Sequence, residues 1–248
     1  MAEQAAAEPI VPAAEPARSP SRIQRPLHFA LEAAVGIAIV AIFGLLVDGD
    51  RVSAIERSVF EFVNGFPGFL ERPLWAFMQV GNLLAAPVAA VVALAVRRWR
   101  LALGFMLAGI GKLALARVVK MLIERHRPHR ILEDVIRRDD FGGGLAFVSG
   151  HAVIAVALAV IAHPYLGRRG RILVWTAAAL VCIGRVYVGA HLPLDVVAGA
   201  ALGWALGAVI NLVIGVPASQ KESTHHGARD QRVLESAAPN ASSTERAP

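Results

Sequence analysis

The feature that most limits what this chain can fold into is a series of long apolar runs. The first extends from Leu27 to Val47, and its only titratable residues are His28 and Glu32. A run of about 20 apolar residues can cross the hydrocarbon core of a bilayer as a helix. Five further runs follow, at residues 73–96, 101–119, 152–166, 172–188 and 192–214. The sequence therefore predicts an all-α, polytopic membrane protein with six transmembrane helices packed as a bundle.

The composition agrees with this fold class. Hydrophobic residues make up 56% of the chain, charged residues make up 18%, and the mean hydropathy is +0.54. A chain this apolar is unlike an ordinary soluble domain. The single cysteine, Cys182, lies within an apolar run, which excludes a disulfide framework and a thiolate metal site. The net charge of +6 is clustered in turns and tails, so we relate it to membrane topology and anion binding and expect no nucleic-acid partner.

Three regions follow from the distribution of apolar residues. Residues 1–26 are rich in Ala, Pro and Glu, and residues 217–248 are polar and poor in bulky side chains. Neither composition supports a packed core, so we predict two disordered cytoplasmic tails around one six-span domain at residues 27–216. No small-residue cleavage site follows the first span, which favours a retained anchor over a removed signal peptide.

The connection at residues 48–72 contains a helical pattern. Ser53 and Glu56 have the spacing of a capping box, in which each side chain satisfies an N–H group at the start of a helix. Apolar residues then recur at helical spacing, at Ile55, Val59, Phe62, Val63 and Phe66. We predict a short amphipathic helix on the outer membrane surface, with an ordinary packed connector as the alternative.

Basic residues predict how the spans are oriented. The N-terminal segment, the turn at 97–100 and the turn at 168–171 are rich in arginine and fall on one side of a six-span arrangement. Basic connections mark the cytoplasmic side of a membrane. We therefore expect a multi-pass protein of the cell's inner (plasma) membrane with both termini in the cytoplasm. Residues 48–72, 120–151 and 184–195 then lie on the extracytoplasmic face.

One extracytoplasmic connection breaks this charge rule. Residues 120–147 carry six cations, which are Lys120, Arg125, Arg127, Arg130, Arg137 and Arg138. Positive charge placed against the topology rule requires a reason, and an anionic ligand supplies one. Two charges near this connection have open roles. Lys112, near the middle of the third span, either is functional or pairs with an intramembrane acid such as Glu32, and Arg125 either assists an anion or caps the end of the span.

Three short segments on this face carry the residues best suited to chemistry. In chain order they are Lys120-x6-Arg127-Pro128, Ser149-Gly150-His151 and Arg185-x5-His191-x3-Asp195. If a helix starts near His191, with Pro193 in its first turn, then His191 and Asp195 share one face. An aspartate at one imidazole nitrogen fixes the tautomer and leaves the other nitrogen as a nucleophile or base.

The order and spacing of these segments resemble the type 2 phosphatidic acid phosphatase superfamily. Its three motifs read Lys-x6-Arg-Pro, Pro-Ser-Gly-His and Ser-Arg-x5-His-x3-Asp, and the resemblance covers about residues 50–214 of this chain. Two positions differ. Val148 replaces the proline, which loses backbone stiffness, and Gly184 replaces the serine, which loses a hydroxyl. Every charged and imidazole position is kept, so we expect catalysis to survive with an altered rate or substrate preference.

Phosphate chemistry suits these residue types. A phosphate ester is dianionic and needs several fixed donors, for which Lys120, Arg127 and Arg185 are candidates, and arginine can bind phosphate oxygens in a bidentate manner. Ser149 is a candidate N-cap, which would leave the N–H groups of Gly150 and His151 directed at an anion.

The histidines are candidates for the chemical steps. We expect His191 to be the nucleophile, Asp195 to orient it, and His151 to protonate the leaving oxygen as general acid. The resemblance implies a phosphohistidine intermediate that water hydrolyses, without metal or cofactor.

The predicted function is that of an integral-membrane, metal-independent lipid phosphatase. Its substrate would be a lipid phosphate or diphosphate in the bilayer, of the phosphatidic acid, polyprenyl diphosphate or phosphatidylglycerophosphate type. One alternative is a non-catalytic lipid-phosphate binder or carrier with the same fold, although both histidines are present. Another is vanadate-dependent halide oxidation, because related haloperoxidases share these motifs, but six spans and lipid access argue against it. The sequence indicates no oligomeric state.

Overall fold

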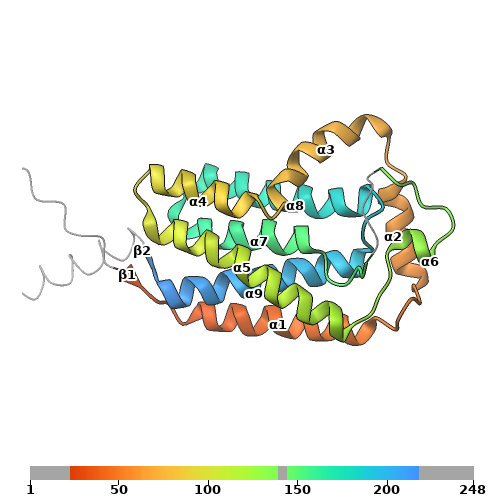
Figure 1. The fold of residues 1–248 in the computed structure, drawn as a ribbon, viewed down its shortest axis with the longest axis horizontal. Coiled ribbons are helices and arrows are strands. Elements are labelled where there is room, and N and C mark those ends of the chain that lie inside the picture. Colours follow the sequence, from red (N-terminus) through yellow and green to blue (C-terminus); the bar gives the residue numbers. More distant parts are fainter. Residues whose placement is uncertain (1–22, 139–143, 218–248) are drawn as a thin grey trace, which may run out of the picture.

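The computed structural model describes residues 23–138 and 144–217, which form a bundle of helices (Figure 1). The predicted disordered tails fall almost entirely on residues 1–22 and 218–248, outside the described part of the chain. The longer helices are α1 (His28–Leu46), α4 (Ala85–Ala95), α5 (Trp99–Leu122), α7 (Gly150–Ala162), α8 (Arg168–Tyr187) and α9 (Pro193–Ile214). The shorter elements are α2 (Ala54–Asn64), η1 (Gly68–Leu70), α3 (Glu71–Met78), η2 (Gln79–Gly81), α6 (Pro128–Ile131) and η3 (His163–Tyr165). Strands β1 (Ile23–Gln24) and β2 (Val216–Pro217) pair antiparallel, with Ile23 opposite Pro217.

The described helices are those of a multi-pass membrane protein. α1, α5, α8 and α9 are long and apolar enough to cross a membrane, and the segment from η1 to α4 makes a fifth if it counts as one span. α7 and η3 are apolar but shorter. Each of the six predicted runs contains a helix, but the count of six spans remains a prediction because one run is bent and one is short.

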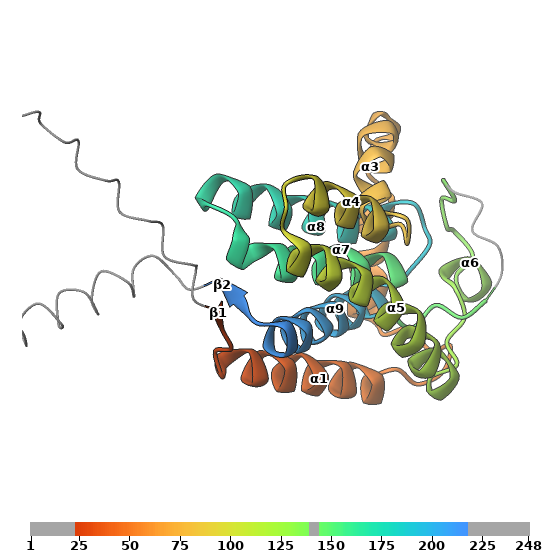
Figure 2. The same ribbon diagram turned by 60° about the vertical axis from the view of Figure 1, so that its left-hand side comes forward.

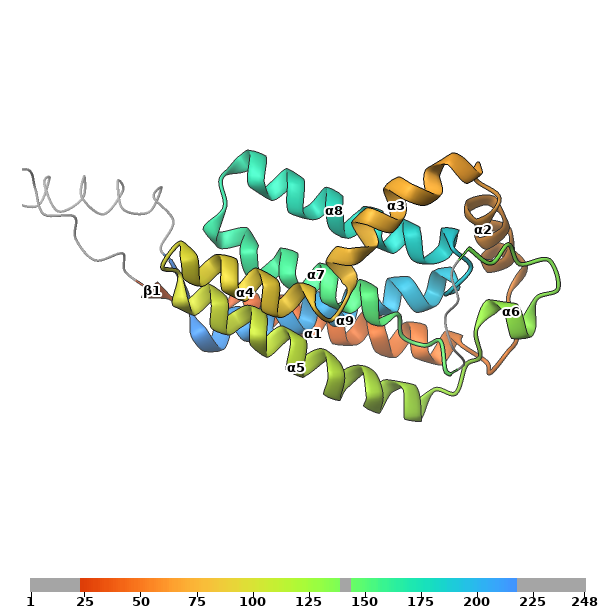
Figure 3. The same ribbon diagram turned by 45° about the horizontal axis from the view of Figure 1, so that its top comes forward.

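The predicted span at residues 73–96 is not one straight helix. The helices before and after its break are bent by 71° (Figure 3). Asn82 has an extended backbone, which ends η2, and its side-chain oxygen accepts a hydrogen bond from the Leu84 N–H at 3.2 Å. Gly81 permits close packing at the bend, since an added Cβ would lie 2.9 Å from the His151 carbonyl oxygen. The bend therefore rests against the start of α7.

The centre of the bundle is α7, which is buried from Ala152 to Ala162 and packs against α9, α8 and α5. Gly199, Gly203 and Gly207 lie four residues apart on α9 and meet α7. A Cβ on Gly199 would lie 2.6 Å from the Ser149 carbonyl oxygen. Small residues at this spacing let two membrane helices approach closely. α1 lies along the other side of α9 (Figure 2), so α9 is held between α7 and α1.

The predicted helix after the first span is present as α2. The Ser53 hydroxyl accepts a hydrogen bond from the Glu56 N–H at 3.2 Å, as the capping pattern predicts. The reciprocal bond is absent because the Glu56 carboxylate turns inward to Arg125. Glu56, Phe60 and Asn64 form the buried face of α2, whereas Ile55 and Phe62 are 80% and 70% exposed. The location of α2 on the outer membrane surface remains a prediction.

Candidate active site

The three sequence segments meet at one end of the bundle, where α5 and α8 end and α7 and α9 begin (Figure 1). Backbone hydrogen bonds join them directly. The Ser149 N–H donates to the Asp195 carbonyl at 2.9 Å, and the Ala146 N–H donates to the Arg125 carbonyl at 2.7 Å. The main chain therefore fixes the segment before α7 relative to the end of α5 on one side and the start of α9 on the other.

The turn between α8 and α9 brings His191 back toward Arg185. The Arg185 carbonyl accepts hydrogen bonds from the N–H groups of Ala190 and His191, each at 3.2 Å. Gly189 has a φ of +75°, a conformation that favours glycine, and an added Cβ would lie 2.9 Å from the Ile136 carbonyl oxygen. Pro193 is in the first turn of α9, as predicted, but α9 begins after His191, so this histidine lies just outside the helix.

His191 lies beside Asp195 without the expected hydrogen bond. The distance from His191 Nδ1 to Asp195 Oδ2 is 3.7 Å, which is longer than a hydrogen bond. The Asp195 carboxylate instead accepts from the Leu192 N–H at 2.9 Å and from Arg125 Nη1 at 3.1 Å. Catalytic hydrogen bonds are often long in unliganded enzymes and tighten when substrate binds. The arrangement therefore suits an orienting role that is completed only in the liganded state.

The surroundings of His191 favour its neutral form. Its side chain is almost fully buried, and this burial lowers the pKa of the imidazole well below its usual value. The nearby cations of Arg185, Arg127 and Lys120 lower this pKa further, and the Ala146 backbone opposes them. A neutral imidazole keeps the lone pair that a nucleophile needs.

A buried ion network supports Asp195, and Glu56 is the member that sequence reasoning missed. The Arg125 side chain is 0% exposed and donates to both Glu56 oxygens, at 3.0 and 2.7 Å, as well as to Asp195. Glu56 also accepts a hydrogen bond from the Leu194 N–H at 3.1 Å. Buried charges require such partners. The guanidinium of Arg125 thus joins α2 to the start of α9, a role that neither sequence-based alternative included.

The three predicted phosphate ligands surround His191, and each also contacts the protein. Lys120 Nζ donates to the carbonyls of Leu145 and Ala146, and thereby holds the segment before Ser149. Arg127 Nη1 donates to the Ala190 carbonyl at 3.3 Å. Arg185 is buried, with Nη1 3.9 Å from the Met78 sulfur. The predicted cations are therefore grouped at the site, while Lys120 has a structural contact that the sequence did not indicate.

Ser149 occupies the predicted N-cap position of α7, but its hydroxyl makes no capping bond. Within the described residues, this buried Oγ has no hydrogen-bond partner. The first hydrogen bond of α7 runs from the Val153 N–H to the Ser149 carbonyl, so the N–H groups of Gly150 and His151 precede it and are available to a ligand. An unpartnered buried hydroxyl beside available N–H groups suits a bound anion.

At both positions that depart from the family pattern, the surroundings are closely packed apolar side chains. A Cβ on Gly184 would lie 3.0 Å from Met78 Cγ, so Met78 occupies the space that a serine side chain would need. Val148 is fully buried in an apolar cluster that includes Phe147 and Ala198. Neither position presents a polar group to the site.

A bound anion would account for only some of the positive charges in the connection at residues 120–147. Arg138 Nη1 donates to the carbonyls of Asn64 and Tyr187, each at 2.7 Å, and its guanidinium lies 4.1 Å from the centre of the Tyr187 ring. Arg138 and Arg125 therefore both stabilise the fold by donating hydrogen bonds to other segments of the protein. The expectation that an anionic ligand accounts for the basic residues of this connection is therefore wrong for these two, whose positive charges satisfy buried protein oxygens.

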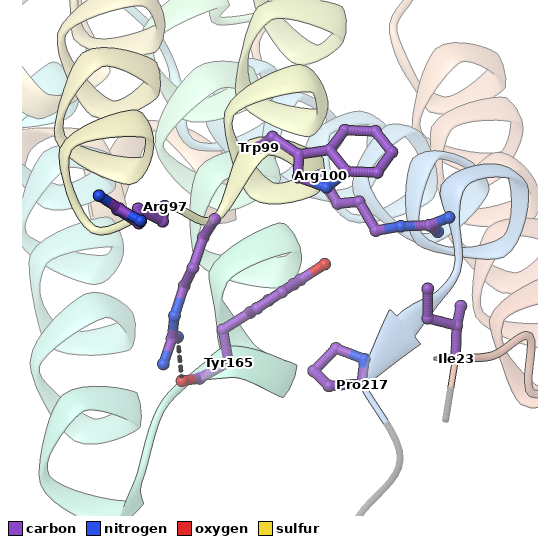
Figure 4. Close-up of a pocket in the computed structure, with 7 residues that line it drawn as sticks. Ile23, Arg97, Trp99, Arg100, Tyr165 and Pro217 are labelled. Carbon is purple, nitrogen blue, oxygen red and sulfur yellow. Dashed lines mark hydrogen bonds between the residues drawn. The ribbon is translucent and has the colours of Figure 1, made fainter. Parts of the chain in front are cut away.

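A separate pocket of about 300 Å³ lies at the opposite end of the bundle, near the β1–β2 pair (Figure 4). Its cations are Arg97, Arg98 and Arg100. Arg98 donates to the Tyr165 carbonyl at 2.8 Å, and Arg100 donates to the Ile214 carbonyl. Among the described residues, no histidine or carboxylate lines this pocket, and we do not consider it the reaction site.

The donor types at the site do not resemble a metal centre. Across residues 23–138 and 144–217, no group of three or more His, Cys, Asp or Glu side chains could hold a metal ion. The metal independence inferred from sequence remains a prediction.

The family model described as the PAP2 superfamily matches residues 97–216. The undecaprenyl-diphosphatase of Sulfolobus acidocaldarius is 25% identical over 181 residues, which are 71% of this chain and 84% of that protein. The decaprenylphosphoryl-5-phosphoribose phosphatase of Mycobacterium tuberculosis is 28% identical over 181 residues, which are 71% of this chain and 89% of that protein.

Solved structures share the fold. A crystal structure of Aquifex aeolicus LpxE matches with a TM-score of 0.60 and 23% identity, over 64% of this chain and 95% of the other. A crystal structure of a transmembrane PAP2 type phosphatidylglycerolphosphate phosphatase from Bacillus subtilis matches with a TM-score of 0.57 and 21% identity, over 73% of this chain and 94% of the other.

Proposed function

We propose that this chain, whose residues 97–216 match the PAP2 superfamily model, is an integral-membrane phosphatase acting on lipid phosphate or diphosphate monoesters. The observation that carries the proposal is the arrangement of His191, Asp195 and three cations. The buried His191, whose pKa is lowered by burial and by the cations of Arg185, Arg127 and Lys120, lies beside Asp195. Both curated relatives are named as phosphatases of polyprenyl-linked substrates, which supports a lipid substrate.

The proposed reaction proceeds through a phosphohistidine. A nitrogen of His191 attacks phosphorus, and the bond from phosphorus to the lipid oxygen breaks as His151 gives its proton to that oxygen. Water then attacks the phosphorus, the phosphorus–nitrogen bond breaks, and His151 accepts the proton that water loses. Asp195 positions His191, while Arg127, Arg185, Lys120 and the start of α7 stabilise the charge on the phosphoryl oxygens.

We also propose the membrane arrangement predicted from sequence, with six spans, cytoplasmic termini and the site on the extracytoplasmic face. The exposed side chains Ile55 and Phe62 on α2 support contact of this helix with the membrane surface. This arrangement would let a lipid phosphate enter the site from the outer leaflet.

Phosphate release from a panel of lipids tests the proposal. Full-length protein in detergent should release phosphate from at least one of phosphatidic acid, phosphatidylglycerophosphate and undecaprenyl diphosphate. The His191→Ala variant should release none above background, since loss of a nucleophile costs several orders of magnitude in rate. If the native protein binds these lipids but hydrolyses none, a lipid-phosphate binder or carrier would be the better interpretation.

Metal independence has its own test. The positive charges of the site are supplied by side chains, so excess chelator should leave the rate of phosphate release nearly unchanged. A large loss of rate that Mg²⁺ or Zn²⁺ restores would contradict this part of the mechanism.

A further inference from the structure

The position of Lys112 on α5 has no explanation in the three motifs. The pairing with Glu32 that the sequence left open is not formed, because Glu32 accepts a hydrogen bond from Trp204 at 3.2 Å and lies near His28. No hydrogen-bond or ion-pair partner of Lys112 occurs among the described residues. An ammonium without a partner in a membrane span is costly and requires a reason.

The Lys112 ammonium lies against the first residue of α7. A Cβ added to Gly150 would be 2.9 Å from Lys112 Cε and 3.2 Å from Nζ, and among the described residues, the two chain neighbours aside, no other side chain lies within 4 Å of that Cβ. Gly150 thus leaves room for the ammonium, and the residue before it is Ser149, whose buried hydroxyl has no hydrogen-bond partner among the described residues. This places Lys112 at the same helix start that the proposed phosphate would occupy.

Burial and the neighbouring positive groups make this position unfavourable for an ammonium in the empty site. The start of a helix carries a partial positive charge, so it repels an ammonium. Lys112 also acts electrostatically on His151 and on Lys120, and Arg185 acts on both of these residues as well. Positive groups therefore converge on the start of α7, and the Asp195 carboxylate that acts on Lys120 is already paired with Arg125. A bound anion would turn these repulsions into attractions.

We propose that Lys112 is a direct ligand of the substrate phosphoryl group, in addition to the cations of the three motifs. This inference rests on the proposed function. It assigns an anionic phosphate ligand to Lys112 and gives Gly150 the task of leaving space for its side chain.

Calorimetry tests the proposal by measuring the affinity of the full-length protein, in detergent, for inorganic phosphate. Lys112→Met should weaken phosphate binding by about ten- to hundredfold, the size of one hydrogen bond to a charged group. Lys112→Arg should retain most of the affinity. Arg117→Met is the matched control because it removes an exposed cation from the same helix, and it should leave the affinity unchanged. Unchanged phosphate binding by Lys112→Met would overturn the proposal.

Thermal unfolding distinguishes a ligand from a structural residue. If Lys112 is a ligand, Lys112→Met should unfold at the same or a higher temperature without phosphate, since a repulsion is removed, and should lose the stabilisation that phosphate gives the native protein. A lower unfolding temperature of the unliganded variant, with the phosphate effect intact, would contradict the proposal.

A double-variant cycle tests the contact with Gly150. Gly150→Ala and Lys112→Ala should each weaken phosphate binding, and their combined loss should be smaller than the sum because the added Cβ acts on Lys112. Fully additive losses would contradict this placement. Phosphate binding does not depend on turnover, so it tests Lys112 even if no lipid is hydrolysed. In that case the phosphatase proposal fails alone, whereas absence of phosphate binding by the native protein overturns the role of Lys112.

Discussion

At the scale of single residues, the site depends on charges that neutralise one another. Arg125 and its two carboxylate partners, Glu56 and Asp195, are almost completely buried. Removing one partner of a buried ion pair leaves the other charge buried without compensation. The resulting loss of folding stability is larger than the net stability that the intact pair supplies. The position of Asp195, and through it His191, is therefore tied to a helix that contains none of the three motifs.

Replacement of Arg125 tests this dependence. Arg125→Met should lower the free energy of unfolding by about 3–5 kcal/mol and reduce the phosphatase rate, because two buried carboxylates lose their cation. Glu56→Gln keeps the shape of the side chain, leaves Arg125 paired with Asp195, and should have a smaller effect on both. Unfolding in detergent and phosphate release are the measurements. Arg130→Met, which removes an exposed cation from the same connection, is the control. Equal behaviour of the Arg125 and Arg130 variants would contradict the supporting role.

The sequence predicted the proximity of site residues that are close together in the chain, but it did not predict a contact between distant residues. His191, Asp195 and Arg185 lie within a short stretch, so their spacing indicates their proximity. Glu56 is 69 residues from Arg125, and no local pattern relates the two. The capping pattern at Ser53 moreover offered a sufficient local reason for Glu56. A contact that only the tertiary fold creates could not be inferred from residue types and spacing.

At the scale of helices, close packing of α7 on α9 fixes the distance between His151 and Asp195. The glycine positions on α9 leave no room for a side chain, and a Cβ at Gly203 would overlap the Val153 carbonyl oxygen. Long apolar runs predicted where helices form. They did not predict the bend at Asn82, because a single polar residue hardly changes the hydropathy of a long window. The capping bond at Asn82 and the packing of Gly81 decide the bend.

Gly203→Ala should separate α7 from α9. The added methyl group meets backbone rather than a flexible side chain, so we expect a loss of about 1–3 kcal/mol in the free energy of unfolding, together with lower activity. Gly167→Ala is a matched control, since an added Cβ there meets nothing within 4 Å. Thermal unfolding of both variants in detergent measures the difference. If Gly203→Ala unfolds like Gly167→Ala, the packing argument is wrong.

At the scale of the whole molecule, the two arginine-rich turns lie at one end of the bundle and the site lies at the other (Figure 1). The hydrogen bond from Arg98 to the Tyr165 carbonyl joins the two turn regions. The sequence predicted this separation because basic connections alternate with the motif-bearing ones. It is the physical basis for expecting the site outside the cytoplasm.

Labelling of single cysteines in intact cells tests this orientation. After Cys182 is replaced by alanine, a cysteine at the exposed position Glu133 should react with a membrane-impermeant thiol reagent. A cysteine at the exposed position Arg169 should react only after lysis. The opposite labelling pattern would place the site in the cytoplasm.

The central claim is that His191 attacks phosphorus and His151 protonates the leaving oxygen. Its most direct test is kcat/KM of the His191→Ala and His151→Ala variants on aryl phosphates with progressively better leaving groups. A good leaving group needs little protonation, so activated aryl phosphates should restore much of the rate to His151→Ala and none to His191→Ala. Restoration of the rate in His191→Ala, or a phosphorylated enzyme trapped without His191, would contradict the claim.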